Sequence, residues 1–263
     1  MLFFTTDHLG RPVRQEKTQT RIMRLKQAVQ QAPPGICTDR SDIWTAYHRN
    51  PLNRKKSPHI QMAEALREVL RKKTIRIYPD ELIVGNYSSK RVGGSIFPEL
   101  HGVPVLMDLF KFSKRAVNPL QITPHEIWKL MKIIPFWAFR FMALKAYRSP
   151  VKIIRLLLHQ LKGYYYIINE SGGISHIAPD YAKLITIGTR GIAEEAFERQ
   201  QQIPPGTEAW NFYQAVQIIA DGLAEFGERY ADLAESMAAR EPSLHRKQEL
   251  IEISRTCRHV PRN

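Results

Sequence analysis

The sequence is poor in cysteine. Its 263 residues contain only Cys37 and Cys257, which lie far apart and outside any CxxC pattern. Neither a disulfide framework nor a thiolate zinc site is therefore indicated. The apolar run that opens the chain, MLFF, is far too short for the core of a signal peptide. We expect a cytoplasmic protein without a bound metal ion.

Common catalytic motifs are also missing. The sequence contains no GxxxxGK[ST], no GxSxG, no HExxH and no GxGxxG between a strand and a helix. The glycines of RVGGSIFPE (91–99) are not followed by a helix start, so we interpret them as a turn rather than a phosphate cradle. Eight of the nine histidines are scattered without the spacing of metal ligands.

Acidic residues are scarce in one region. The stretch from Lys90 to Lys162 has 13 Lys and Arg against three Asp and Glu, so it supplies ten of the fourteen net positive charges. The rest of the chain is close to balanced. Such a distribution predicts a local basic face rather than a chain-wide polyelectrolyte role.

Long apolar runs are missing as well. Charged residues interrupt the densest stretch, IIPFWAFRFMALKAY (133–147), whereas a spanning helix needs about 20 predominantly apolar residues. We expect no membrane span, and the pattern favours two helices broken at Pro135 and Pro150 that pack on a larger core. The alternative is a basic peripheral binding protein whose residues 129–162 contact an anionic membrane or nucleic acid.

Helical patterning, by contrast, is abundant, and a hydrophobic content of 43% suffices for a buried core. TIRIYPDELIVGN (74–86) predicts two short strands or an extended passage around a turn at Pro79-Asp80. Pro204-Pro205-Gly206 suggests a linker near 203–207. The fold class is mainly α with a few short strands. Helices are expected, from apolar spacing, over 18–31, 36–50, 60–73, 215–237 and 245–257, the last capped by Ser243.

One histidine differs from the others in its surroundings. In NESGGISHIAPDY (169–181), His176 follows two glycines that allow a turn or a close approach to a ligand, and Pro179 stiffens the exit. A helix is expected to begin at Asp180-Tyr181. The residues alone leave two interpretations open: a loop histidine bonded to a nearby carbonyl, or a site residue that moves a proton near neutral pH.

Several segments occur in a distinctive order, including ICTDR (36–40), ELIVGN (81–86), IFPEL (96–100) and HIAPDY (176–181). This order resembles the N-terminal part of the glycyl radical enzymes, the pyruvate formate-lyase-like (PFL) superfamily, in the branch that holds glycerol dehydratase and other dehydratases and lyases. The resemblance runs from about Arg21 to the last residues and is weakest over 102–160. We therefore treat residues 1–263 as a partial PFL domain, its N-terminal region only.

The resemblance implies a fold and a chemistry. Members form a ten-stranded α/β barrel wrapped in helices, of which this chain would be an incomplete part. A glycyl radical, installed by a radical SAM activating enzyme, abstracts hydrogen from a cysteine on a central loop, and the resulting thiyl radical attacks the substrate. We expect no cofactor bound by this chain itself.

The reactive residues of the family have no counterpart in this sequence. Neither Cys37 nor Cys257 matches the catalytic cysteine loop. RVGGS (91–95) echoes the RVxGY radical loop, but it directly follows ELIVGN, where relatives have an ordinary connecting segment. We therefore assign no catalytic residue and expect the chain to be inactive alone.

The resemblance assigns a role to His176. In glycerol dehydratase-like members the histidine of the matching segment contacts a substrate hydroxyl and assists proton movement as water leaves, whereas pyruvate formate-lyase is similar there but holds its carboxylate with an arginine. A histidine offers one bond and a titratable proton in place of a fixed fork, which argues against pyruvate. Ser175 departs from the glycine usual in relatives.

The family also suggests partners. We expect a complementary C-terminal chain or a full-length homologue, because the helix faces would normally pack on barrel elements. Members are often homodimers, and no nucleic acid is expected on this interpretation. Exposed hydrophobic surface follows as a further expectation.

Overall fold

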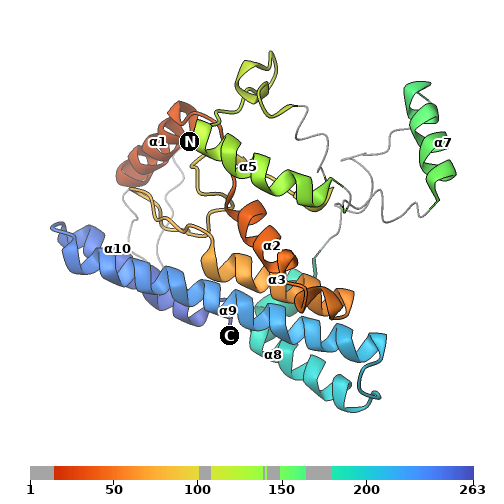
Figure 1. Ribbon diagram of the computed structural model, residues 1–263. Helices are drawn as coiled ribbons and strands as arrows, with labels where there is room; N and C mark the ends of the chain where they lie inside the picture. The colour runs from red at the N-terminus through yellow and green to blue at the C-terminus, as the bar shows by residue number, and fades with distance from the viewer. Residues whose placement is uncertain (1–14, 101–107, 139, 141–148, 164–178) are drawn as a thin grey trace.

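The computed structural model describes residues 15–100, 108–138, 140, 149–163 and 179–263 (Figure 1). This part of the chain is mainly helical, with one two-stranded sheet, as the fold class predicted. Short 3-10 turns occur at Asn53–Lys55 and Phe112–Lys114. The α-helices are α1 (Gln15–Gln31), α2 (Asp39–Arg49), α3 (Pro58–Lys72), α5 (Pro124–Trp137), α7 (Pro150–Leu161), α8 (Tyr181–Gln201), α9 (Glu208–Arg240) and α10 (Leu244–His259).

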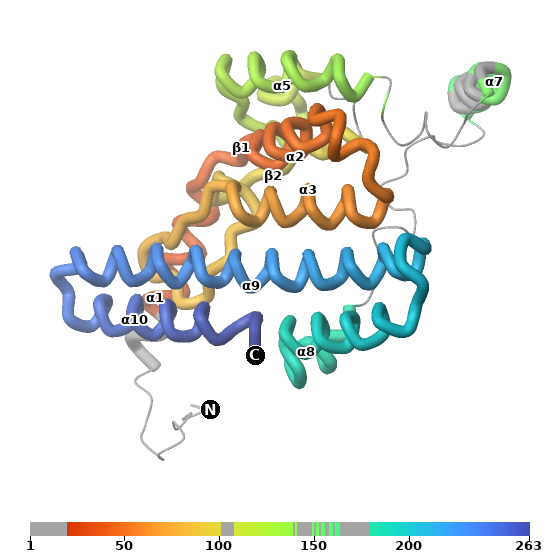
Figure 2. Tube along the Cα trace, turned by 60° about the horizontal axis from the view of Figure 1, so that its bottom comes forward, coloured from red at the N-terminus to blue at the C-terminus, as the bar shows by residue number. Residues whose placement is uncertain are grey.

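Helix α9 is the central helix of the lower half of the molecule, in contact with α3, α8 and α10. In Figure 2 it runs between α3 on one side and α8 and α10 on the other. Its buried positions are dominated by small side chains, which let neighbouring helices approach closely because little volume separates the two backbones. They are Ala215, Ala220, Gly222, Ala224, Gly227, Tyr230, Ala231, Ala234 and Ala238.

The helix ends follow from local chemistry. Thr207 and Ser243 cap α9 and α10, each accepting the backbone N–H three residues on, at 3.2 and 3.4 Å. The cap predicted at Ser243 is confirmed. The proposed linker near 203–207 is, in the structure, the turn that joins α8 to α9.

The predicted break at Pro135 is wrong. Pro135 lies inside α5, and the helix continues to Trp137. Pro135 has no N–H to donate to Met131 O, but only two helical residues follow it, and Ala138 still donates to Ile134 O at 2.8 Å. At Pro150 the prediction is confirmed, because α7 begins there.

The predicted turn at RVGGS is also wrong. Gly93–Ser95 forms strand β2, which pairs in parallel with β1 (Gly35–Cys37). A Cβ on Gly93 would lie 2.7 Å from Gly35 O and 2.9 Å from Ser88 Oγ. The absence of a side chain at Gly93 therefore allows the backbones of β1 and β2 to approach each other. Local sequence patterns do not predict this pairing, because the partner strand lies far away in the sequence.

Residues 74–86 are extended rather than two strands, the second of the two predicted alternatives. The predicted turn at Pro79-Asp80 is present, with Asp80 at a φ of 66°. Tyr230 of α9 fixes the end of this passage: its hydroxyl accepts from Asn86 N at 2.8 Å and donates to Asn86 Oδ1 at 3.0 Å. The passage is thus attached to the main helix by side-chain bonds instead of a strand ladder.

The upper half has its own apolar core. It gathers around β1 and α5 and is linked to α2 by a buried bond, in which Trp137 Nε1 donates to Thr45 Oγ1 at 2.8 Å. The core residues are Ile36, Ile96, Leu109, Phe112, Leu130, Ile133 and Ile134.

Candidate functional site

The predicted site residue, His176, lies outside the described residues, together with the glycines and Ser175 before it. The structure describes the exit of that segment, which starts at Pro179. Asp180 is the N-cap of α8, and its Oδ1 accepts from Lys183 N at 2.9 Å. The helix expected to begin at Asp180-Tyr181 is therefore confirmed.

The first turns of α8 present apolar surface. The exposed fraction is 62% for Tyr181 and 79% for Ile185. Soluble helices normally bury such side chains. This face lies immediately after the predicted site segment in the chain and is available for contact with a ligand or a partner.

Helix α8 is broken in its middle. Gly188 has φ 62° and ψ −178°, which separates an arm, residues 181–187, from the remainder of the helix. Sequence inspection did not single out this residue, although an isolated glycine inside a helical pattern is a known signal of such a feature. The direction in which the arm leaves the molecule is set at this point.

The structure describes both cysteines. Cys37 on β1 is 3% exposed, and its Sγ accepts from Ser89 N at 3.3 Å and Ser89 Oγ at 3.2 Å. Cys257 is half-buried, and burial raises the pKa of its thiol. The Cys37 sulfur is thus enclosed by protein, whereas Cys257 is only partly covered.

Lys73 is a partly buried lysine at the end of α3. Its ammonium donates to the carbonyls of Asn86 and Tyr87 at 2.6 and 3.0 Å and lies 5.3 Å from the ring centre of Phe226. Desolvation by burial lowers its pKa. With two carbonyl acceptors already bound, Lys73 acts as a structural donor here.

A cleft of about 680 Å³ lies between α2 and α3. Glu64 accepts from the Tyr47 hydroxyl and pairs with Lys56 at 2.6 Å. Burial and the Glu64 carboxylate both raise the pKa of Tyr47, so this phenol stays a neutral donor. Arg67 and Arg71 both pair with Glu225. Glu64, Arg67 and Arg71 of the cleft each have an ion-pair partner just outside its lining, which leaves little to attract a charged ligand.

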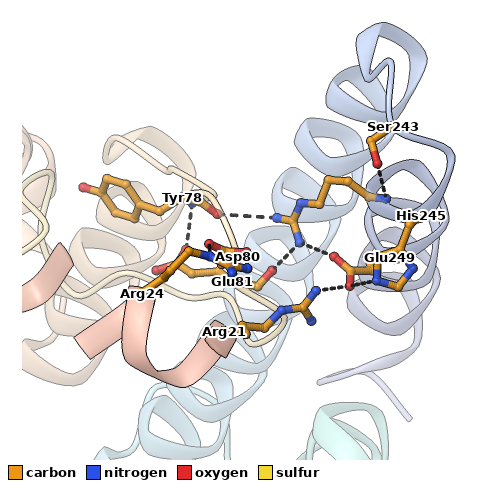
Figure 3. Close-up of polar contacts among 9 residues, drawn as sticks. Arg21, Arg24, Tyr78, Asp80, Glu81, Ser243, His245 and Glu249 are labelled. Atoms are coloured by element: carbon orange, nitrogen blue, oxygen red, sulfur yellow. Dashed lines mark hydrogen bonds and ion pairs between the residues drawn. The ribbon is translucent and has the colours of Figure 1, made fainter. Parts of the chain in front are cut away.

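A second cleft, of about 380 Å³, lies between α1, the 77–80 passage and α10. Figure 3 shows Arg21 pointing toward Glu249. Glu249 also pairs with Arg246 at 2.9 Å, and Arg246 donates a second hydrogen bond to Glu81 O at 2.9 Å. Arg24 forms a two-bond pair with Asp80 at 2.7 and 2.6 Å. The network joins α1, the extended passage and α10, which are distant in sequence, so we interpret it as a structural contact that holds these segments together.

The carboxylates of this network have shifted pKa values. The hydrogen bond from Arg24 lowers the pKa of Asp80. Burial alone would raise the pKa of Glu249, but the hydrogen bonds from Arg21 and Arg246 outweigh it, and the pKa lies below its usual range. Both groups are therefore ionised near neutral pH and hold their arginines in place.

No group of three or more His, Cys, Asp and Glu among the described residues could hold a metal ion. None of the described helices is both long and apolar enough to cross a bilayer.

Comparison with known proteins gives a consistent result. The family described as pyruvate formate lyase-like matches residues 14–263. The isethionate sulfite-lyase of Desulfovibrio desulfuricans is 27% identical over 96% of this chain and 32% of its own length. The (2S)-3-sulfopropanediol dehydratase of Klebsiella oxytoca is 25% identical over 98% of this chain and 32% of its own.

Solved structures of glycyl radical enzymes are similar to this chain in fold. A glycyl radical enzyme from Archaeoglobus fulgidus superposes with a TM-score of 0.81 at 29% identity, covering 92% of this chain and 31% of that one. The glycerol-bound B12-independent glycerol dehydratase from Clostridium butyricum gives a TM-score of 0.81 at 24% identity, over 99% and 32%. The chain thus spans about a third of the length of these relatives.

Proposed function

Because the chain belongs to the pyruvate formate lyase-like family, we propose that it is the N-terminal part of a glycyl radical lyase or dehydratase acting on a small hydroxylated substrate. The match over residues 14–263 carries this proposal. The relatives are named for isethionate, sulfopropanediol, glycerol and trans-4-hydroxy-L-proline, each a small molecule with a hydroxyl group. The fold would be an incomplete portion of the family's barrel.

His176 is the proposed substrate contact. A neutral imidazole accepts or donates one hydrogen bond to a hydroxyl and can pass a proton near neutral pH, which suits the departure of a hydroxyl as water. The capped start of α8 at Asp180, four residues further along the chain, supports this by giving the segment a fixed exit.

The chain alone is proposed to be inactive. A protein glycyl radical acts through a cysteine thiol that the substrate can reach, and the enclosed Cys37 and the half-buried Cys257 do not fit that role. We derive no radical step through either residue. A second polypeptide, or a further stretch of the same one, would supply both the cysteine and the glycine loops.

Complementation tests the proposal. The DNA downstream of the codon for Asn263 is examined for an in-frame or frameshifted continuation, and that product is co-expressed with this chain and a radical SAM activating enzyme under anaerobic conditions. Turnover of glycerol, isethionate or another small hydroxylated compound is then measured. We expect turnover only with both polypeptides, and its loss in His176→Gln.

His245→Gln is the matched control, because His245 is exposed on α10 and lies in a satisfied network. Full turnover by His176→Gln, or turnover by this chain alone, would contradict the proposal.

The surface of the chain supports a missing partner. Large apolar side chains are exposed on several helices, among them Met23 at 64%, Met62 at 54% and Phe197 at 52%. Exposed apolar area of this kind marks interaction surfaces in soluble proteins. We expect the isolated chain to bind hydrophobic dyes, and a dye-silent, cooperatively unfolding monomer would count against this expectation.

A second candidate function rests on α7. Val151, Ile154 and Leu161 are 73%, 59% and 84% exposed, and Lys152 and Arg155 beside them are exposed as well. Figure 1 shows α7 set apart from the other helices. Aliphatic groups beside basic ones suit an anionic membrane surface better than nucleic acid, which offers no aliphatic surface to bury.

Sedimentation with vesicles tests this candidate. Binding to phosphatidylserine vesicles that weakens with salt and is lost in Lys152→Ala/Arg155→Ala would favour it. Equal sedimentation of the variant and the parent would remove it.

A further inference from the structure

The break in α8 at Gly188 lies against residues 260–263, which are distant from it in the sequence. At Gly188 the backbone adopts φ 62° and ψ −178°. This region of backbone space is open essentially to glycine alone, because any Cβ collides with the chain's own carbonyl. Gly188 is also buried, so the break is held inside the protein rather than at a frayed surface.

Residues 260–263 fill the space beside the break. A Cβ on Gly188 would contact Arg262 O and would lie 2.7 Å from Arg262 C and 2.8 Å from Asn263 Cα. These are backbone atoms, which cannot rotate away as a flexible side chain could. Figure 2 shows residue 263, marked C, beside α8.

The same residues replace hydrogen bonds that the break removes. Thr189 N donates to Pro261 O at 2.8 Å, and Arg190 N donates to Arg262 O at 3.1 Å. In an unbroken helix these two N–H groups would bond to carbonyls of residues 185 and 186. Carbonyls from residues 260–263 therefore cap the second half of α8, as a side chain caps an ordinary helix start.

Residues 260–263 are held in turn by α9. A Cβ on Gly227 would lie 2.8 Å from Cys257 O, 2.9 Å from Val260 O and 3.0 Å from Pro261 Cδ. Arg262 also pairs with Glu228 at 2.8 Å. The segment thus lies between two glycines, one on α8 and one on α9, and its position depends on both.

We propose that Gly188, Gly227 and residues 260–263 form one positioning device, which fixes the direction in which the arm 181–187 leaves α8. The inference rests on the proposed function in one respect: the arm directly follows the segment of the proposed substrate contact, so its direction governs how that segment reaches a substrate. The device positions the site and takes no part in bond making.

Hydrogen exchange of the full 263-residue chain tests the device without any activity. Gly227→Ala introduces a methyl group against Val260 and Pro261, at a position of ordinary helical backbone where alanine is otherwise favoured. We expect the amides of Thr189 and Arg190, on the other side of the segment, to exchange about tenfold faster because their acceptors shift. Unchanged exchange at both amides would overturn the proposal.

Gly222→Ala is the matched control. It lies in the same helix, and its Cβ would meet the Arg67 side chain at 3.0 Å, away from residues 260–263. It is expected to leave the exchange of Thr189 and Arg190 unchanged. Equal acceleration by both substitutions would indicate a general loosening of α9 and would also overturn the proposal.

A second pair of variants tests Gly188 itself. Gly188→Ala and removal of residues 261–263 should each accelerate exchange of the arm. Together they should accelerate it by less than the sum of the two effects, because the truncated chain keeps the backbone strain at Gly188 but loses the collision of the methyl group with Arg262 and Asn263. Additive effects would contradict the device. If Gly188→Ala does not fold, the truncation and Gly227→Ala still decide the question.

The functional consequence has its own readout. In the complemented enzyme, Gly227→Ala should raise KM for the hydroxylated substrate severalfold more than Gly222→Ala, with a comparable amount of folded protein. If complementation itself gives no turnover, the proposed function fails while the exchange result stands. If exchange responds and KM does not, the device exists but does not position the site.

Discussion

Helices α9 and α7 have the same kind of sequence pattern and opposite surroundings. Along α9 the buried positions are mostly alanine and glycine, and α3, α8 and α10 pack against this helix. Along α7 the exposed apolar positions are large, and Leu161 reaches 84% exposure. Periodicity therefore predicts that a helix forms, whereas residue size indicates how closely a neighbour approaches. Small residues suit a partner helix already present in the chain.

The largest difference should appear when one leucine is shortened in each region. Leu250 of α10, 0% exposed against α9, is replaced by alanine, and Leu158 of α7, 51% exposed, serves as its counterpart. We expect Leu250→Ala to lower the free energy of unfolding by about 2–5 kcal/mol, since it leaves a cavity. Leu158→Ala should change it by less than about 0.5 kcal/mol. Urea unfolding measures both, and equal losses would show that α7 is packed after all.

A smaller effect is expected at the bond between α9 and the extended passage. Tyr230→Phe removes the hydroxyl that serves Asn86 twice, at a side chain only 2% exposed. Leaving these buried groups unsatisfied should cost about 1–3 kcal/mol. Tyr181→Phe, at an exposed tyrosine of the α8 arm, is the control and should be neutral in the same urea titration.

The acid dependence of stability should separate the two regions further. The pKa of Glu249 is lowered in the folded chain from a reference of 4.5. Its contribution is therefore complete above that reference value and disappears as the pH falls through the folded pKa, because the unfolded state binds the proton more readily. The helix α7 contains no carboxylate, so it takes no part in this loss.

The measurement compares urea midpoints at neutral pH and near pH 3. Glu249→Gln should be less stable than the parent at neutral pH and should lose less on acidification. The control is Glu252→Gln, at a side chain that is 65% exposed in a pair with Arg255. An acid loss identical in the parent and in Glu249→Gln would exclude the network as its source.

The smallest effect is expected at the surface pairs between α9 and α10. Arg258 pairs with Asp232 at 2.9 Å and with Glu235 at 2.6 Å, and all three side chains are well exposed. Solvent and salt screen such pairs strongly. Arg258→Ala should give no measurable change in the urea midpoint. A clear loss would mean that charge, as well as apolar contact, holds the two helices together.

The sequence was most informative where a structure is local. The apolar spacing of α3 and α9, the cap at Ser243 and the helix start at Asp180-Tyr181 were predictable, because each depends on residues within one or two turns of helix. The site residue His176 came from resemblance and stays a prediction. The predicted break at Pro135 was wrong because only two helical residues follow this proline in α5.

Features made by distant segments could not be predicted in this way. Strand β2 is a run of two glycines and a serine with no strand pattern, and it exists because β1 lies beside it. The ion pair of Arg21 with Glu249 joins residues more than two hundred positions apart. Neither contact leaves a signature in the residues around it.

Sequence patterns were enough to predict that most of these stretches are helical and to which family the chain belongs. The break of α8 at Gly188, the capping of its second half by residues 260–263 and the apolar faces left uncovered arise from contacts between distant segments. The two kinds of feature differ in range. Helix formation satisfies backbone groups within a few residues, whereas a break, a cap from afar or a buried face depends on what the rest of the chain brings next to it.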